Sequence, residues 1–135
     1  MYKILSDVDE AYRYVNEFFP LPRSSNLKGI VLKKNGETKA AALFENYNGT
    51  NIYVHLAGAP GRRFGNREFL HWGFHYPFVQ LGCKRMTAYI EANNADSIRL
   101  AEHMGFRREA TLAGAGRDGV DAYIYVMFRE DCRYA

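Results

Sequence analysis

A run of alternating segments across residues 29–58 constrains the fold more than any other part of the sequence. Apolar and polar residues alternate over 30–34, Asn35-Gly36 is a two-residue hairpin signal, and the alternation resumes over 38–45 and 51–58. A period of two is typical of half-buried strands, and Asn-Gly readily adopts the left-handed conformations of a type I′ turn. The sequence therefore predicts a three-stranded antiparallel meander.

The segment after the meander ends this pattern and predicts an anion-binding site. Residues 57–61 are small and include Pro60, which has no N–H to donate to a neighbouring strand. Residues 61–67 then carry two glycines and three arginines directly before a helical pattern. Unpaired N–H groups and the helix dipole attract anions at a helix start, so this loop suits a diphosphate. An ordinary solvated turn is the alternative.

Helical and extended patterns surround the meander. We expect a short apolar segment at 2–5, a helix from a Ser6 or Asp7 cap to about Phe19, the three strands, a helix at about 65–81, a strand at 84–91, a helix at about 96–104, and strands at 106–112 and 122–129. Pro77 predicts a kink or an early end in the second helix, and Gly105 predicts a left-handed cap on the third. The glycine-rich loop 113–119 is expected to be loose.

Length and composition fit a single globular domain spanning residues 1–135. The chain has 135 residues, of which 47% are hydrophobic, enough for one core. A net charge of +3 without a polybasic tract allows a nucleic-acid partner but does not favour one. Cys83 and Cys132 are expected to be free thiols in the cytoplasm, and no apolar run predicts a membrane span or signal peptide.

Two segments in the second half carry a resemblance to a known family. Residues 94–109 read NADSIRLAEHMGFRRE, and residues 76–85 read YPFVQLGCKR. Together they resemble the GNAT superfamily of acyl-CoA-dependent N-acyltransferases, over about residues 28–130. Within it the sequence looks most like the RimJ/RimL-like branch of ribosomal-protein acetyltransferases, including compact acetyltransferases carried by phages and prophages.

The resemblance implies both a fold and a reaction. The fold is α/β (α+β), with a mixed, mostly antiparallel sheet of six or seven strands that is flanked by helices and splayed at its central strands. One of the usual N-terminal helices is missing. The reaction is direct transfer of an acetyl group from the co-substrate acetyl-CoA to a primary amine on a protein N-terminus, a lysine or a small molecule.

The resemblance also implies the residues that bind the cofactor. Family loops usually read Arg or Gln, two residues, Gly, one residue, then Gly or Ala; residues 62–66 match, and Arg67 departs from the pattern. This arginine could bind a phosphate or crowd it. Asn94 is expected to contact the pantetheine arm, with a plain helix cap as the alternative. The implied set is Leu56, Ala57, Arg62, Arg63, Phe64, Gly65, Asn66, Arg67 and Asn94.

The catalytic acid implied by the resemblance is Ser97. Many GNAT enzymes place a tyrosine four residues before the Gly-Phe pair, but that position is Ala101 here. The RimJ/RimL-like branch instead has a serine three residues after an asparagine, as in Asn94 and Ser97. Ser97 would then bond the CoA sulfur and donate a proton. Its alternative role is to fill the first helical turn.

The sequence offers several candidates for the general base. His55 precedes the cofactor loop and can accept a proton near neutral pH, although a histidine on a strand is often a structural hydrogen-bonding group. Glu45, Glu91 and Asp121 are carboxylates that could act through water. We expect no metal, because Trp72 stands between His71 and His75 where a zincin has glutamate.

The sequence is also consistent with two other functions. Ala101 and Arg67 are consistent with a GNAT-type binding protein that has lost turnover. The phage-like resemblance and the basic charge are consistent with an acyltransferase that acts on nucleic acid. The acceptor is not identified by any motif, and the edge strands permit a homodimer without requiring one.

Overall fold

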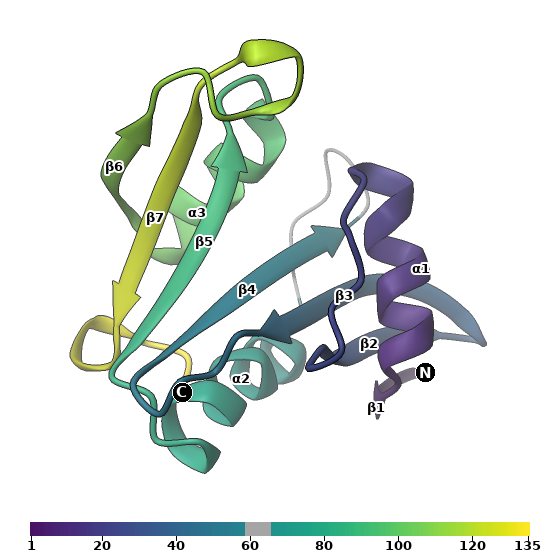
Figure 1. Ribbon diagram of the computed structural model, residues 1–135. Coiled ribbons are helices and arrows are strands. Elements are labelled where there is room, and N and C mark those ends of the chain that lie inside the picture. Colours follow the sequence, from purple (N-terminus) through teal and green to yellow (C-terminus); the bar gives the residue numbers. More distant parts are fainter. Residues whose placement is uncertain (59–65) are drawn as a thin grey trace.

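The computed structural model describes residues 1–58 and 66–135, which form one seven-stranded sheet with helices on both faces (Figure 1). The strand order is β1-β2-β3-β4-β5-β7-β6, and every pair in this part of the chain is antiparallel except β4–β5, which is parallel. The elements are β1 (Tyr2–Ser6), α1 (Val8–Phe18), β2 (Lys28–Lys34), β3 (Glu37–Glu45), β4 (Asn51–Gly58), α2 (Arg67–His75), a π-helical turn (Tyr76–Gln80), β5 (Arg85–Glu91), α3 (Ala95–Met104), β6 (Arg107–Leu112) and β7 (Ala122–Phe128), with 3₁₀ turns at Arg117–Gly119 and Arg129–Asp131.

The predicted meander is confirmed. β2 and β3 are joined at Asn35 and Gly36, whose φ angles of 53° and 82° are those of a type I′ turn. β3 then pairs with β4 along six residues, from Ala40 opposite Gly58 to Glu45 opposite Tyr53. The hairpin signal thus fixes the register from which the rest of the sheet extends.

Helix α1 covers one face of the meander. Its N-cap is Asp7, whose carboxylate accepts the backbone N–H of Glu10 at 3.1 Å. The fully buried Ala11 and Val15 pack in a cluster with Val31, Leu43 and other residues of β2, β3 and β4. The predicted first helix is therefore confirmed, together with its cap.

Glu10→Gln should make the protein less sensitive to acid. Arg13 donates to the Glu10 carboxylate at 2.7 and 2.8 Å, and Thr38 donates to it at 2.5 Å. These hydrogen bonds lower the pKa of Glu10 from 4.5 to about 2, and the bonds from Arg13 make the largest contribution. Because the folded pKa lies below the unfolded one, this stabilisation is complete above about pH 4.5 and is lost as the pH falls toward 2.

Urea unfolding across this pH range measures the effect. The variant should be less stable by about 1 kcal/mol at pH 7, because solvent screens the exposed Arg13–Glu10 pair. Wild type and variant should converge near pH 2. An undiminished difference at that pH would contradict the assignment.

Pro77 divides the second helix as expected. Asn66 caps α2 by accepting the N–H of Phe69 at 2.8 Å, and the α-helical pattern stops at His75. Pro77 has no N–H for the α-helical bond to the fourth residue before it, and the chain continues as a π-helical turn in which the Leu81 N–H bonds the Tyr76 carbonyl at 3.0 Å. The predicted early end is confirmed.

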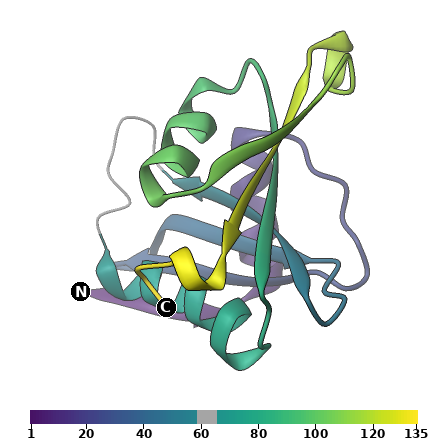
Figure 2. The same ribbon diagram turned by 90° about the vertical axis from the view of Figure 1, so that its left-hand side faces the viewer.

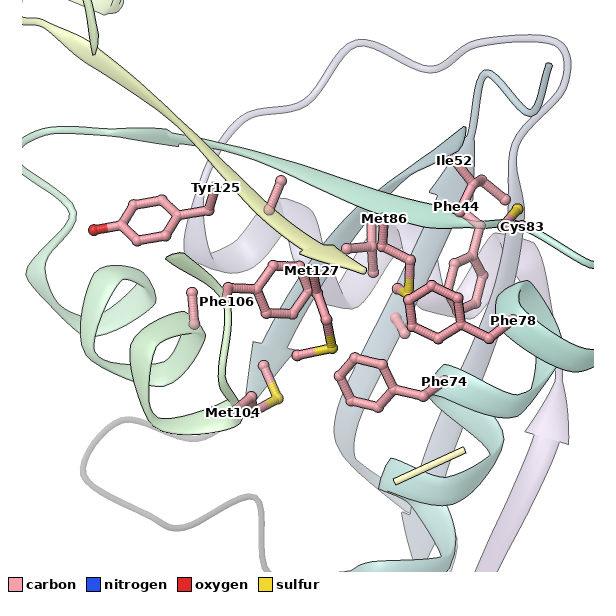
Figure 3. Packing of buried hydrophobic residues seen from close by; sticks show 14 of the residues in the cluster. Phe44, Ile52, Phe74, Phe78, Cys83, Met86, Met104, Phe106, Tyr125 and Met127 are labelled. Carbon is pink, nitrogen blue, oxygen red and sulfur yellow. The ribbon is translucent and has the colours of Figure 1, made fainter. Parts of the chain in front are cut away.

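Two hydrophobic clusters lie on opposite faces of the sheet. The larger cluster packs α2, its π-helical turn and α3 against the sheet (Figures 2 and 3). It includes Phe44, Phe74, Phe78, Met86, Met104, Phe106, Tyr125 and Met127. The smaller cluster lies under α1. Alternate residues of β4 therefore face different layers: Val54 points toward α2 and α3, whereas Ala57 points toward α1.

Candidate active site

The two central strands pair at one end only. β4 and β5 are in register at three positions, from Asn51 opposite Arg85 to Tyr53 opposite Thr87, and beyond them the strands diverge (Figure 1). The buried Thr87 hydroxyl donates to the side-chain oxygen of Asn51 at 2.6 Å and so holds the closed end together. The predicted splay of the central strands is confirmed.

A small cavity of about 40 Å³ lies between the diverging strands. Its lining residues come from β4, β5 and α3, with Phe106 after the helix. They are Val54, His55, Leu56, Ala88, Tyr89, Ile90, Ser97, Leu100, Ala101, Met104 and Phe106. Two predicted catalytic residues, Ser97 and His55, and one predicted cofactor-binding residue, Leu56, are thus brought to one place.

The N-terminus of α3 places Ser97 at this cavity. Asn94 is the N-cap, and its side-chain oxygen accepts the N–H of Ser97 at 3.2 Å. The Ser97 hydroxyl has no hydrogen-bond partner among residues 1–58 and 66–135, so it is available to a ligand. At the other end, Gly105 adopts a φ of 106° and the Phe106 N–H bonds the Ala101 carbonyl at 2.9 Å. The predicted left-handed cap at Gly105 is confirmed, and Asn94 has the cap role that was the alternative to a pantetheine contact.

The other predicted cofactor-binding residues are divided among three settings. Arg62, Arg63, Phe64 and Gly65 lie outside the described residues. Ala57 is buried under α1, so only its backbone can reach a ligand in the cleft. Asn66 caps α2, and Arg67 is exposed in the first turn of that helix. Their contacts with a cofactor stay predictions.

His55 lies on the face of the sheet opposite to α2 and α3. Its Nε2 is 2.6 Å from Oε2 of Glu45, and both side chains are largely buried. The hydrogen bond from His55 is the main reason that the pKa of Glu45 is below its usual value, and the nearby Ser24 hydroxyl adds to it. The two predicted catalytic residues therefore approach the gap from opposite faces, with His55 on the α1 side and Ser97 on the α3 side.

Loop 113–119 is held against the end of β5, and the prediction of a loose loop is wrong. The Glu91 carboxylate accepts the backbone N–H of Arg117 at 2.5 Å and its guanidinium N–H groups at 2.8 and 3.0 Å. Tyr89 donates to the carbonyl of Ala115 at 3.1 Å. Glu91 is thus tied to an arginine, which lowers the pKa of its carboxyl group, and the loop is ordered beside the open end of the cleft.

Gly116→Ala should release this loop. A Cβ at Gly116 would lie 2.7 Å from Cγ2 and 2.8 Å from the carbonyl oxygen of Val120, and 3.2 Å from a Glu91 oxygen. We expect the Arg117 amide to exchange its hydrogen at least about tenfold faster in the variant. Gly73→Ala is the matched control, because a Cβ at Gly73 would meet nothing within 4 Å. Unchanged exchange at Arg117 would show that the loop can shift without leaving β5.

Sequence reasoning missed several parts of the site. Ala88, Leu100 and Met104 line the cavity but carry no chemical signal in the sequence. The contact between Thr87 and Asn51 was also missed, because it requires the pairing of two strands far apart in the chain. Ala101 does lie in the cavity wall, so the position of the usual tyrosine is part of the site although the tyrosine is absent.

Other features of the described residues lie apart from the cleft. A larger hollow of about 500 Å³ separates α2 from β1 and β2 and contains no predicted site residue. In residues 1–58 and 66–135, no group of three His, Cys, Asp or Glu side chains is placed to hold a metal ion. None of the helices in these ranges combines the length and apolar character needed to cross a membrane.

Solved structures share this architecture. A mutant of the spermidine/spermine N-acetyltransferase from Vibrio cholerae superposes with a TM-score of 0.73 at 14% identity, covering 96% of each chain. A dodecameric spermidine N-acetyltransferase from the same organism gives a TM-score of 0.73 at 15% identity, covering 96% of this chain and 94% of the other. A GNAT-family acetyltransferase from Bacillus anthracis gives 0.63 at 20% identity, covering 78% and 67%.

These likenesses define the class of the fold. The single sheet, the opened parallel pair and the superpositions together show that the chain has the GNAT fold. No protein-family model and no curated protein matches the sequence. At identities of 14–20%, the likeness describes the fold alone.

Proposed function

We propose that the chain, as a single domain, is an acyl-CoA-dependent N-acetyltransferase that moves an acetyl group from acetyl-CoA to a primary amine. The observation that carries the proposal is the open end of the β4–β5 pair. Beyond Tyr53, β4 has no β5 partner, so its backbone N–H and C=O groups on that side face the gap. An extended ligand with amide groups, such as the pantetheine arm of CoA, can pair with them as a strand would.

The cavity beyond this edge suits a small acyl group. Its volume of about 40 Å³ is roughly three times the 10–15 Å³ that one water needs on the same measure. Apolar side chains, including Leu100 and Met104, form much of its wall. An acetyl group can enter a space of this size and polarity.

The reaction requires an amine, a thioester and two proton transfers. The neutral amine attacks the thioester carbon, so a C–N bond forms while the C–S bond breaks and sulfur takes the electron pair. In this proposal His55 accepts the proton released by the amine on the α1 side. Ser97 donates a proton to the departing sulfur on the α3 side and regains one from solvent. Asn94 keeps the first turn of α3 in place for this step.

Within the superfamily, we place the chain in the RimJ/RimL-like branch and among phage-type enzymes. The support is the Asn94–Ser97 spacing: Asn94 caps α3, and the Ser97 hydroxyl lies at the cavity with no hydrogen-bond partner in the described part of the chain. The acceptor is an amine on a protein or a small molecule. The edge strands β1 and β6 leave room for a homodimer.

A thermal-shift titration with acetyl-CoA and free CoA tests the proposal. A ligand that binds the native state alone raises its apparent stability by about 2.7 kcal/mol at a concentration one hundred times Kd. We expect both compounds to raise Tm, and an amine panel should then reveal acceptor-dependent thiol release. Binding without thiol release would indicate a binding protein, and no shift at millimolar acetyl-CoA would overturn the proposal.

A further inference from the structure

The Glu45–His55 pair sits where β4 leaves β5. His55 is two residues beyond the last β4–β5 pairing at Tyr53, and Glu45 reaches it from the neighbouring strand β3, where Glu45 pairs with Tyr53. The imidazole Nε2 and the carboxylate Oε2 are 2.6 Å apart, and the side chains are only 10% and 13% exposed. The pair is therefore a defined, mostly dry contact at the open end of the cleft.

This contact selects one form of the imidazole. An ionised carboxylate only accepts hydrogen bonds, so the neutral ring must carry its proton on Nε2 and donate it to Glu45. Nδ1 then keeps its lone pair. It has no hydrogen-bond partner among the residues that the structure describes, so it can take up a proton.

Resting on the proposed function, we infer that Glu45 is a positioning residue for the transfer, which holds His55 in the Nε2–H form so that Nδ1 accepts the proton of the attacking amine. The amine nitrogen forms the bond to the acetyl carbon, its proton moves to Nδ1, and the electron pair of the C–S bond stays on sulfur. Glu45 exchanges no proton in this step; it keeps its negative charge beside the new imidazolium.

A purely structural role explains the pair less well. Placing a histidine and a carboxylate on a largely buried stretch of sheet removes both from water, and apolar residues of similar volume stabilise such a position equally well or better. The neighbouring inward positions on this face of the sheet, Leu43 and Ala57, are apolar. A polar pair beside the gap is instead what proton transfer requires.

The tautomer can be measured without any substrate. Long-range ¹H–¹⁵N spectra of labelled protein distinguish Nδ1–H from Nε2–H, and a His55→Asn variant assigns the His55 signals. We expect Nε2–H in the wild type and in Glu45→Gln, whose side-chain oxygen still accepts the bond, but a mixture in Glu45→Ala. His71 is the internal control, because its Nδ1 donates to the Tyr134 carbonyl at 3.1 Å and should stay Nδ1–H throughout. Nδ1–H at His55 in the wild type, or an unchanged His55 in Glu45→Ala, would overturn the inference.

Enzyme kinetics provide a second, independent test of the role of Glu45. With an amine that elicits thiol release from the wild type, Glu45→Ala should lower kcat by at least about tenfold, while the Tm shift caused by acetyl-CoA stays the same. Glu45→Gln, which keeps the tautomer, should lose less. Wild-type kcat in Glu45→Ala would overturn this inference alone. A wild type that releases no thiol with any amine would overturn the proposed function as well, and the spectra would still report the tautomer separately.

Discussion

Ser97→Ala should lower the turnover of acetyl transfer by about 10²–10⁴-fold while the affinity for acetyl-CoA stays the same. The departing thiolate needs a proton, and the Ser97 hydroxyl is the donor that the N-terminus of α3 presents to the cavity. Because the Ser97 backbone N–H, not its hydroxyl, bonds to Asn94, the substitution leaves the cap in place. Turnover by thiol release and affinity by thermal shift measure the two expectations separately.

A matched control shows whether the effect belongs to the cleft. Ser25→Ala removes an exposed hydroxyl from the loop between α1 and β2, and should change neither turnover nor Tm. Ser97→Ala should resemble it in Tm, within about 0.5 kcal/mol of stability. If Ser97→Ala turns over like the wild type, the sulfur takes its proton from solvent, and Ser97 is only part of the cavity wall.

The parts of the fold that could be read from the sequence depend on neighbours in the chain. Asn35-Gly36 specifies a type I′ turn, and Gly105 supplies a left-handed cap. Asp7 caps the helix that follows it by accepting the N–H of the residue three positions later. None of these depends on the remainder of the molecule. Pro77 likewise acts on its own helix. In each case the chemistry of one or two residues decides the local conformation, so the prediction needed no tertiary contact.

The candidate site was less predictable because its contacts join distant segments. His55 and Glu45 were each named as candidates, but their pairing depends on the β3–β4 register. Loop 113–119 was misjudged for the same reason. Its glycines suggested mobility, whereas Gly116 is required by close approach to Val120, and Glu91 holds Arg117 from another strand. Composition describes what a loop can do alone, and the contacts with β5 determine what it does here.

Phe74→Ala should cause the largest loss of stability, about 3–5 kcal/mol. Phe74 is 2% exposed and lies in the larger hydrophobic cluster, close to Phe78 and Met127 (Figure 3). Its ring is 6.4 Å from that of Phe78 within the α2 region, 6.1 Å from Phe106 at the end of α3, and 5.1 Å from Tyr134 near the C-terminus. Removing the ring leaves a cavity where these elements meet, so we expect Tm to fall by about 10–20 °C.

Phe18→Ala is the control, since Phe18 is also a helical phenylalanine but is 38% exposed at the end of α1. Its loss should lower stability far less than the loss of Phe74. Phe74→Ala also tests ligand binding. If acetyl-CoA binds in the cleft, saturating ligand should restore part of the stability lost in Phe74→Ala, because it favours the folded state. If Phe74→Ala is as stable as Phe18→Ala, the elements on either side of the cleft are held together mainly at its closed end, where Thr87 of β5 bonds Asn51 of β4.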